Sequence, residues 1–108
     1  MSIEATASLQ TNVSLKDITS IELADIVISL NGRDVGKQFI VIETDTVYSL
    51  LADGKGRRYE KPKRKKNKHM KFQYRPNNPI SEKLKSGEKV TNNEIRRFLA
   101  EYSSLGGM

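Results

Sequence analysis

Short runs of β-branched and aromatic residues recur through the middle of the chain, each closely followed by Gly, Pro, Asn or Asp. Such runs predict strands, because these side chains fit a pleated surface, and the residues that follow favour turns. Five short strands within about fifty residues indicate a mainly β fold, a small barrel of about five strands. The predicted strands cover residues 24–30, 38–43, 46–52, 57–61 and 68–75.

Two of these strands have informative patterns. The segment QFIVIE at 38–43 is apolar on both faces and should lie in the centre of the sheet. In the last strand Met70, Phe72 and Tyr74 alternate with polar residues, a period of two that indicates a strand inside a basic run. We expect Asp53-Gly54 to turn the chain into the strand at 57–61, Pro62 to end that strand, and residues 63–67 to form a solvated loop.

Two helices should follow the barrel. Asn78 and Pro79 can begin the first, and Gly87 can end it. The sequence TNNE at 91–94 is a capping box that predicts the start of the second. The apolar stripe of that helix can either pack on the barrel or dock into a groove on a partner; it consists of Ile95, Phe98, Leu99 and Tyr102, with Arg96 and Arg97 off the stripe.

The length of 108 residues suits one small domain. We expect a flexible N-terminal segment at 1–20, the barrel at 21–75 and a C-terminal helical extension at 76–108. The chain has no Cys, which excludes disulfides and thiolate metal sites and fits a cytoplasmic protein. No secretory signal or membrane-spanning run is evident, and we expect a monomer.

Charge is concentrated in one part of the chain. The formal net charge is +6, but residues 55–75 hold eleven Lys and Arg against one acidic residue, a net charge of +10. The rest of the chain therefore carries −4. This asymmetry favours a polyanionic partner, RNA above all. Alternatives are an anionic membrane surface, a nuclear localisation signal at 62–66, or a solvated run of charge that aids solubility.

The candidate RNA contacts are the basic residues from 57 to 71 within this segment, together with two from an upstream loop. They are Arg33, Lys37, Arg57, Arg58, Lys61, Lys63, Arg64, Lys65, Lys66, Lys68, His69 and Lys71. A single His without Cys or clustered acids is a poor metal candidate. Four aromatic residues can either stack on bases or fill the core, and core packing is favoured: Tyr48, Tyr59, Phe72 and Tyr74.

The loop at 31–37 reads NGRDVGK, and its two glycines allow a compact turn with positive φ at both. Gly32, Asp34 and Gly36 are the expected turn residues. No Gly-Lys-Ser/Thr ending is present, so the loop is not a phosphate-binding P-loop.

The stretch IVISLNGRDVGKQFIVI at 26–42 resembles a KOW motif, in which apolar and polar residues alternate around a fixed glycine, here Gly32. With LADG at 51–54, EKPK at 60–63 and Lys68-His69, the chain is similar to KOW-domain RNA-binding proteins of Gram-positive bacteria. Those proteins are similar to archaeal and eukaryotic large-subunit ribosomal proteins of the six, fourteen and twenty-seven families. The resemblance covers roughly residues 23–71. Asn31 departs from it, since relatives usually carry a small or basic residue there.

The resemblance implies an SH3-like barrel, RNA binding and association with the ribosome or the translation machinery. KOW domains also serve in transcription factors, so a protein-interaction module is the alternative. No Cys nucleophile is present, and no Ser has a matching base, so we expect no enzyme activity and no cofactor. The sequence therefore favours a non-catalytic module that binds RNA, with ribosomal RNA as the expected partner.

Overall fold

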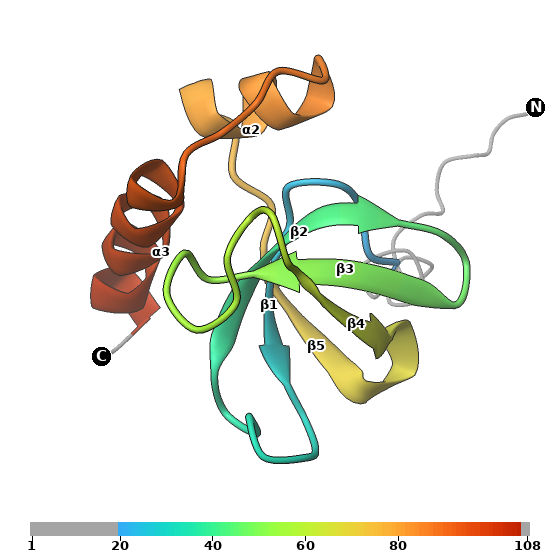
Figure 1. Ribbon diagram of the computed structural model, residues 1–108. Coiled ribbons are helices and arrows are strands. Elements are labelled where there is room, and N and C mark those ends of the chain that lie inside the picture. The colour runs from blue at the N-terminus through green and yellow to red at the C-terminus, as the bar shows by residue number, and fades with distance from the viewer. Residues whose placement is uncertain (1–19, 107–108) are drawn as a thin grey trace, which may run out of the picture.

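The computed structural model describes residues 20–106 of the chain (Figure 1). Its elements are β1 (Ile26–Ser29), β2 (Gln38–Thr44), β3 (Tyr48–Ala52), β4 (Lys63–Lys66), the 3-10 helix η1 (Asn67–His69), β5 (Met70–Tyr74), α2 (Pro79–Lys85) and α3 (Asn92–Gly106). The predicted flexibility of the N-terminal segment concerns residues that, except for Ser20, lie outside the described part.

The five strands form one antiparallel sheet in the order β4-β3-β2-β1-β5. The first strand therefore pairs with the last, for example through Val27 and Phe72. Shifts in register on β1 and on β2 mark bulges, which bend a sheet and increase its twist. The two edge strands follow each other in the chain and are joined by η1. The predicted fold class, a mainly β domain with a small barrel-like sheet and a C-terminal helical extension, is confirmed.

Alternation along the strands produces two buried clusters, one on each face of the sheet. One cluster lies inside the curved sheet and consists of Val27, Phe39, Val41, Leu51 and Met70. The other joins the opposite face to the helices and includes Ile26, Ile40, Ala52, Leu84, Val90, Ile95, Phe98 and Leu99. Because β2 supplies residues to both clusters, the prediction that residues 38–43 are central in the sheet is confirmed.

The prediction of a strand at 57–61 is wrong. The Arg57 carbonyl accepts hydrogen bonds from the backbone N–H groups of Asp53 and Gly54, so the chain turns there instead of pairing with β3. Gly54 does adopt the expected positive φ, 81°. The chain then continues as a loop through Pro62.

The prediction of a solvated loop at 63–67 is also wrong, because residues 63–66 form β4. Lys65 pairs with Ser49 and Lys66 with Tyr48 on β3. The last strand begins at Met70 because Lys68 and His69 belong to η1. Met70 is buried and Lys71 is exposed, as the alternation predicts.

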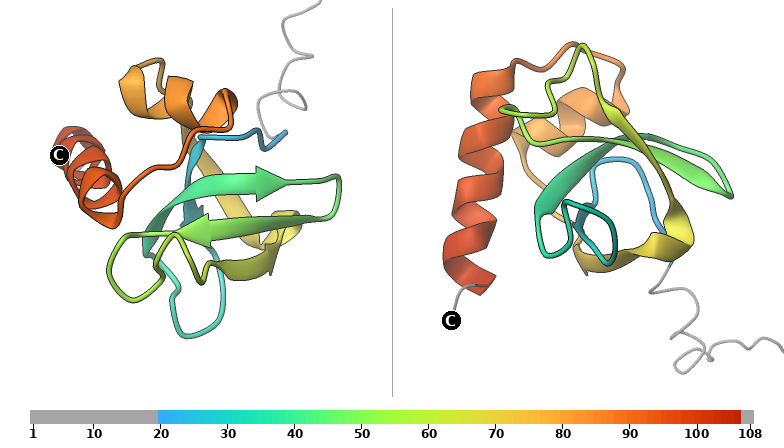
Figure 2. Two further views of the ribbon diagram at one scale, coloured as in Figure 1. Left: turned by 45° about the horizontal axis from the view of Figure 1, so that its top comes forward. Right: turned by 60° about the horizontal axis from the view of Figure 1, so that its bottom comes forward.

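Both helices begin where the sequence predicts. The Asn78 side chain caps α2, and Thr91 and Glu94 exchange hydrogen bonds in the capping box of α3. The stripe of α3 packs on the sheet: Ile95, Phe98 and Leu99 are buried, and Tyr102 is packed against the same cluster. Figure 2 shows α3 lying along one side of the sheet. No helix within residues 20–106 is both long enough and apolar enough to cross a membrane.

Candidate nucleic-acid interface

The four basic residues of β4, Lys63–Lys66, are divided between its two faces. Arg64 is exposed, and its guanidinium lies 3.6 Å from the centre of the Tyr48 ring. Lys63 and Lys65 point to the other side, and Lys65 is only 9% exposed. A strand with alternating faces explains this division, because neighbouring side chains project in opposite directions. The run is thus partly an outward basic surface and partly an internal contact.

The internal contact is made with Asp34. Its Oδ1 lies 3.5 Å from the Lys65 Nζ, and its Oδ2 lies 3.0 Å from the Lys63 Nζ. The Ser29 hydroxyl donates to Oδ1 at 2.7 Å. Lys65 also donates to the Asn31 carbonyl at 3.1 Å. Two ammonium groups therefore share one carboxylate beneath the loop at residues 31–37.

This environment changes the acidity of the carboxyl group. Burial by itself would raise the pKa of Asp34, but the Ser29 hydroxyl and the ammonium groups of Lys63 and Lys65 outweigh it and lower the pKa to about 2. Asp34 is therefore ionised at neutral pH and is engaged in holding two cations. It is a structural residue of the loop.

The geometry of the 31–37 loop brings Asp34 to this position. Gly32 and Gly36 have φ of 83° and 85°, which confirms the predicted positive φ at both. The Gly36 N–H donates to the Ser29 carbonyl and the Lys37 N–H to the Asp34 carbonyl, so the loop is compact. Its place beside β4 depends on the ion pairs of Asp34.

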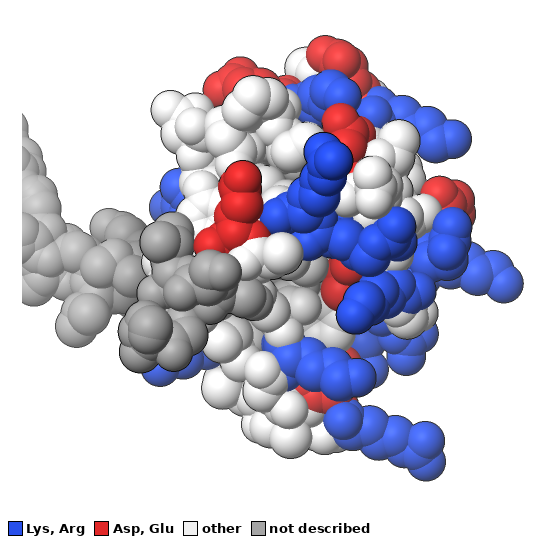
Figure 3. Space-filling view, turned by 90° about the vertical axis from the view of Figure 1, so that its left-hand side faces the viewer, with Lys and Arg blue, Asp and Glu red and all other residues white. Residues whose placement is uncertain are grey.

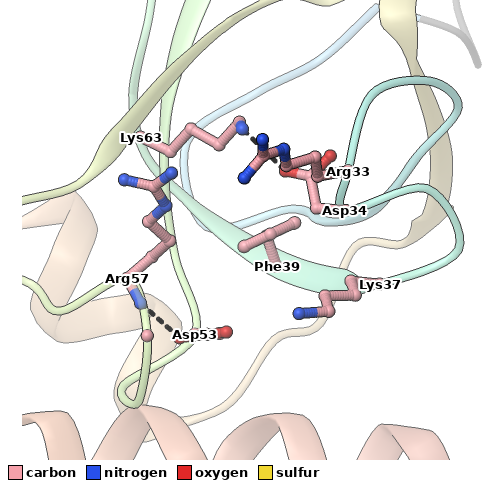
Figure 4. Close-up of a pocket in the computed structure, with 8 residues that line it drawn as sticks. Arg33, Asp34, Lys37, Phe39, Asp53, Arg57 and Lys63 are labelled. Carbon is pink, nitrogen blue, oxygen red and sulfur yellow. Dashed lines mark hydrogen bonds and ion pairs between the residues drawn. The ribbon is translucent and has the colours of Figure 1, made fainter.

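The loop and the basic segment together line an open groove, here called the Arg33 groove (Figure 4). It has a volume of about 380 Å³ and is lined by Arg33, Asp34, Lys37, Phe39, Asp53, Gly56, Arg57 and Lys63. Four predicted RNA-contact residues from three separate segments thus meet in one place. The expectation that Arg33 and Lys37 join the basic segment agrees with this arrangement.

A second groove, here called the Arg96 groove, shares Lys37 and Asp53 with the first. It adds Lys55 and Arg96, two cations absent from the predicted set. Lys55 could have been chosen from its place in the charged segment. Arg96 lies on a different element. Its position off the apolar stripe of α3 was the one feature of the sequence that indicated an outward-facing cation.

Helix α3 holds the loop at 53–62 in place. Arg96 donates to the Gly54 carbonyl at 2.6 Å, and the Asn92 side chain accepts from the Tyr59 N–H at 2.7 Å. The Asn92 amide also donates to both carboxylate oxygens of Glu60 at 3.0 Å. The loop that carries Arg57 is therefore anchored at two points, and this fixes the backbone positions of its cationic residues.

Lys and Arg side chains crowd the centre and right of the face that carries α3 (Figure 3). The other predicted contact residues line neither groove. Arg58 and Lys61 are exposed on the 53–62 loop, while Lys68, His69 and Lys71 lie on η1 and at the start of β5. Arg75, in the same charged segment, keeps about a third of its side chain exposed (35%) but is engaged in an ion pair: it donates to Asp25 at 2.8 and 3.0 Å, and this hydrogen bonding raises the pKa of Arg75.

The aromatic residues divide in the same way. Tyr59 and Tyr74 pack against the core cluster, as predicted for core residues. Tyr48 is half-buried under Arg64, and Phe72 lies 5.0 Å from the Arg75 guanidinium. Tyr48 and Arg64 thus form a stacked pair at the outer face of β4.

Within the described residues, no three His, Asp or Glu side chains are close enough to hold a metal ion. In a comparison with known proteins, no family model matches the chain and the curated proteins contain no match. The KOW resemblance therefore rests on the motifs quoted above.

Proposed function

We propose that the protein is a non-catalytic RNA-binding module of the KOW type that binds ribosomal RNA or associates with the large ribosomal subunit. The observation that carries the proposal is the basic face formed by the Arg33 and Arg96 grooves, whose cations come from the 31–37 loop, the 53–62 loop, β4 and α3. Phosphate contacts by such cations release counterions, which supplies affinity for any nucleic acid.

The fixed positions of the cations favour this function over a charge run that only aids solubility. Like charges repel, so a folded protein gains nothing in stability from gathering them in grooves. Here buried contacts hold the two loops that carry them, through Asp34 on one side and through Asn92 on the other. The stacked Arg64 and Tyr48 add a surface of the kind that nucleotide bases stack on.

The test is binding of the full chain to ribosomal RNA fragments over a series of salt concentrations. The variant Lys37→Glu/Lys55→Glu reverses two exposed charges that line the Arg96 groove, one of which also lines the Arg33 groove. The change is limited to these two because Lys63 and Lys65 hold Asp34, and reversing them would disrupt the fold. We expect weaker binding and a salt slope reduced by about 2, since each lost phosphate contact removes roughly one unit.

The matched control is Lys85→Glu/Lys89→Glu, which changes the net charge equally at exposed positions on α2 and just after it. It should bind RNA much as the parent protein does. No RNA binding at low salt, or equal losses in the two variants, would overturn the proposal.

The alternative is a protein-interaction module of the translation or transcription machinery that uses the barrel or the C-terminal helix. The apolar stripe of α3 is buried against the sheet, so the stripe does not favour this alternative. Association with ribosomes that resists RNase and is unaffected by Lys37→Glu/Lys55→Glu would favour the alternative.

A further inference from the structure

The Arg33 groove combines cations in a way that the rest of the basic face does not. The head groups of Arg33, Arg57 and Lys63 point toward one another from three segments, above the buried ring of Phe39 (Figure 4). Lys37 lies at the rim. With Asp34 and Asp53 included, four cations and two carboxylates line the groove, which leaves a net positive charge.

The carboxylates of the groove are already engaged. Both oxygens of Asp34 are within ion-pair distance of an ammonium group, that of Lys63 or that of Lys65. Asp53 Oδ1 accepts hydrogen bonds from the backbone N–H groups of Lys55 and Arg57, each at 2.9 Å. These bonds shape the loop that presents the Arg57 side chain.

The two guanidinium groups are available for a ligand. Within residues 20–106, neither Arg33 nor Arg57 has a side-chain hydrogen bond or ion pair. Behind them, Lys63 and Lys65 share the single carboxylate of Asp34 in a place where Lys65 is almost fully buried. One positive charge there lacks a counter-charge, and burial makes that imbalance costly. An anion beside Lys63 would relieve it.

From this geometry we propose that the Arg33 groove is a phosphate subsite, in which Arg33, Arg57 and Lys63 hold one phosphate group of a bound RNA. A planar guanidinium donates two parallel hydrogen bonds to phosphate oxygens, and an ammonium group supplies a further charge. Asp34 acts as a positioning residue that keeps Lys63 at the groove. The volume of about 380 Å³ lies within the range of small-ligand sites. The inference rests on the proposed function and deepens it.

The phosphate can come from two sources, an internal phosphodiester or the terminal phosphate of an RNA strand. An oligonucleotide with a 5′-phosphate and the same oligonucleotide with a 5′-hydroxyl separate them. Tighter binding of the phosphorylated strand assigns the terminal group. Equal binding, combined with a loss in the variant described next, assigns an internal phosphate.

The direct test uses the isotope-labelled full chain and inorganic phosphate at constant ionic strength, with chloride as the balancing anion. We expect saturable shifts of the backbone amide signals of Arg33, Gly56 and Arg57. The variant Arg33→Gln/Arg57→Gln should lose these shifts and bind RNA about tenfold more weakly near 0.1 M salt, as expected for one phosphate contact. The matched control Lys85→Gln/Lys89→Gln should keep them. Asp34→Asn would strengthen phosphate binding if only charge mattered, because it removes a negative charge beside the subsite. A positioning role for Asp34 predicts the opposite, weaker phosphate binding while the fold, read from the remaining amide signals, persists.

The two proposals fail in different ways. If RNA binds but phosphate gives no saturable shifts, and Arg33→Gln/Arg57→Gln binds RNA as the control does, the phosphate subsite is overturned and the RNA-binding function stands. If phosphate binds at these residues but no RNA binds, the proposed function is overturned and the anion site remains.

Discussion

At the scale of single residues, Asp34 joins the 31–37 loop to β4 through the ammonium groups of Lys63 and Lys65. A buried ammonium group without a carboxylate is costly, because its hydration is lost and nothing replaces it. Asp34 thus connects the stability of the sheet to the shape of the Arg33 groove.

We predict that Asp34→Asn lowers the free energy of unfolding by about 3 kcal/mol, because Lys65 stays buried without its counter-charge. The double variant Asp34→Asn/Lys65→Met should recover part of the loss, since no buried ammonium group then remains. Urea denaturation at neutral pH measures both. Equal stability of Asp34→Asn and the parent protein would contradict the prediction.

The same carboxylate predicts a pH dependence. The pKa of Asp34 falls from 3.8 to about 2 on folding, so the folded state binds fewer protons than the unfolded state between these values. Its contribution, roughly 2 kcal/mol, is fully present above pH 4 and is lost as the pH falls toward 2. Denaturation curves at several pH values should show a larger loss in the parent protein than in Asp34→Asn, in which the other carboxyl groups with lowered pKa remain.

Two glycines of the 53–62 loop make a matched pair for a third prediction. A Cβ at Gly54 would lie 2.5 Å from the Asn92 carbonyl oxygen and 2.9 Å from the Arg96 Cγ, at a φ of +81°. A Cβ at Gly56 meets nothing within 4 Å. We expect Gly54→Ala to destabilise the protein by roughly 2–4 kcal/mol and Gly56→Ala by less than about 0.5 kcal/mol. Thermal unfolding compares them, and equal losses would show that the loop does not pack on α3 as described.

At the scale of elements, the helices and four of the five strands could be predicted from local patterns. Capping at Asn78 and at Thr91 depends on residues three positions apart, so the sequence alone reveals it. The alternation of Met70, Phe72 and Tyr74 likewise belongs to one strand. These signals do not depend on where the rest of the chain lies.

The fourth strand could not be predicted in this way. The segment KRKK has low β-propensity, and it forms a strand because Asp34, distant in the sequence, compensates the buried charge of Lys65. The segment RRYEK looked more strand-like, but α3 holds it as a loop through Asn92 and Tyr59. Local sequence patterns could not predict that Arg96 lies in the candidate site, because its position depends on how α3 packs on the 53–62 loop.

The hydrogen bonds from Asn92 of α3 to Tyr59 and Glu60 of the 53–62 loop give a prediction at the scale of elements. Asn92→Ala removes the acceptor for the Tyr59 N–H and the donor to Glu60. We expect faster hydrogen exchange of the Tyr59 amide, while amides of β2 keep their protection, because the sheet does not depend on these hydrogen bonds. Exchange followed by mass spectrometry measures it. Unchanged exchange at Tyr59 would indicate that other contacts hold the loop.

At the scale of the whole molecule, the cations of the basic face act together on a polyanion. If about five of them contact phosphates, binding to duplex RNA should fall with salt at a log–log slope of about −4 to −5. Affinity measured from low to moderate salt gives this slope. A slope near zero would mean that binding does not depend on the basic face.

The pairing of β1 with β5 also determines when this molecule can fold. The sheet is incomplete until β5 has been synthesised, because β1 pairs with this strand, which lies far along the chain. Contacts of such long range require the intervening chain to be ordered first, which slows folding relative to a protein built from local contacts. Helix α3 comes later still, and it covers the apolar face of the sheet. A newly made chain therefore exposes that face until α3 is in place.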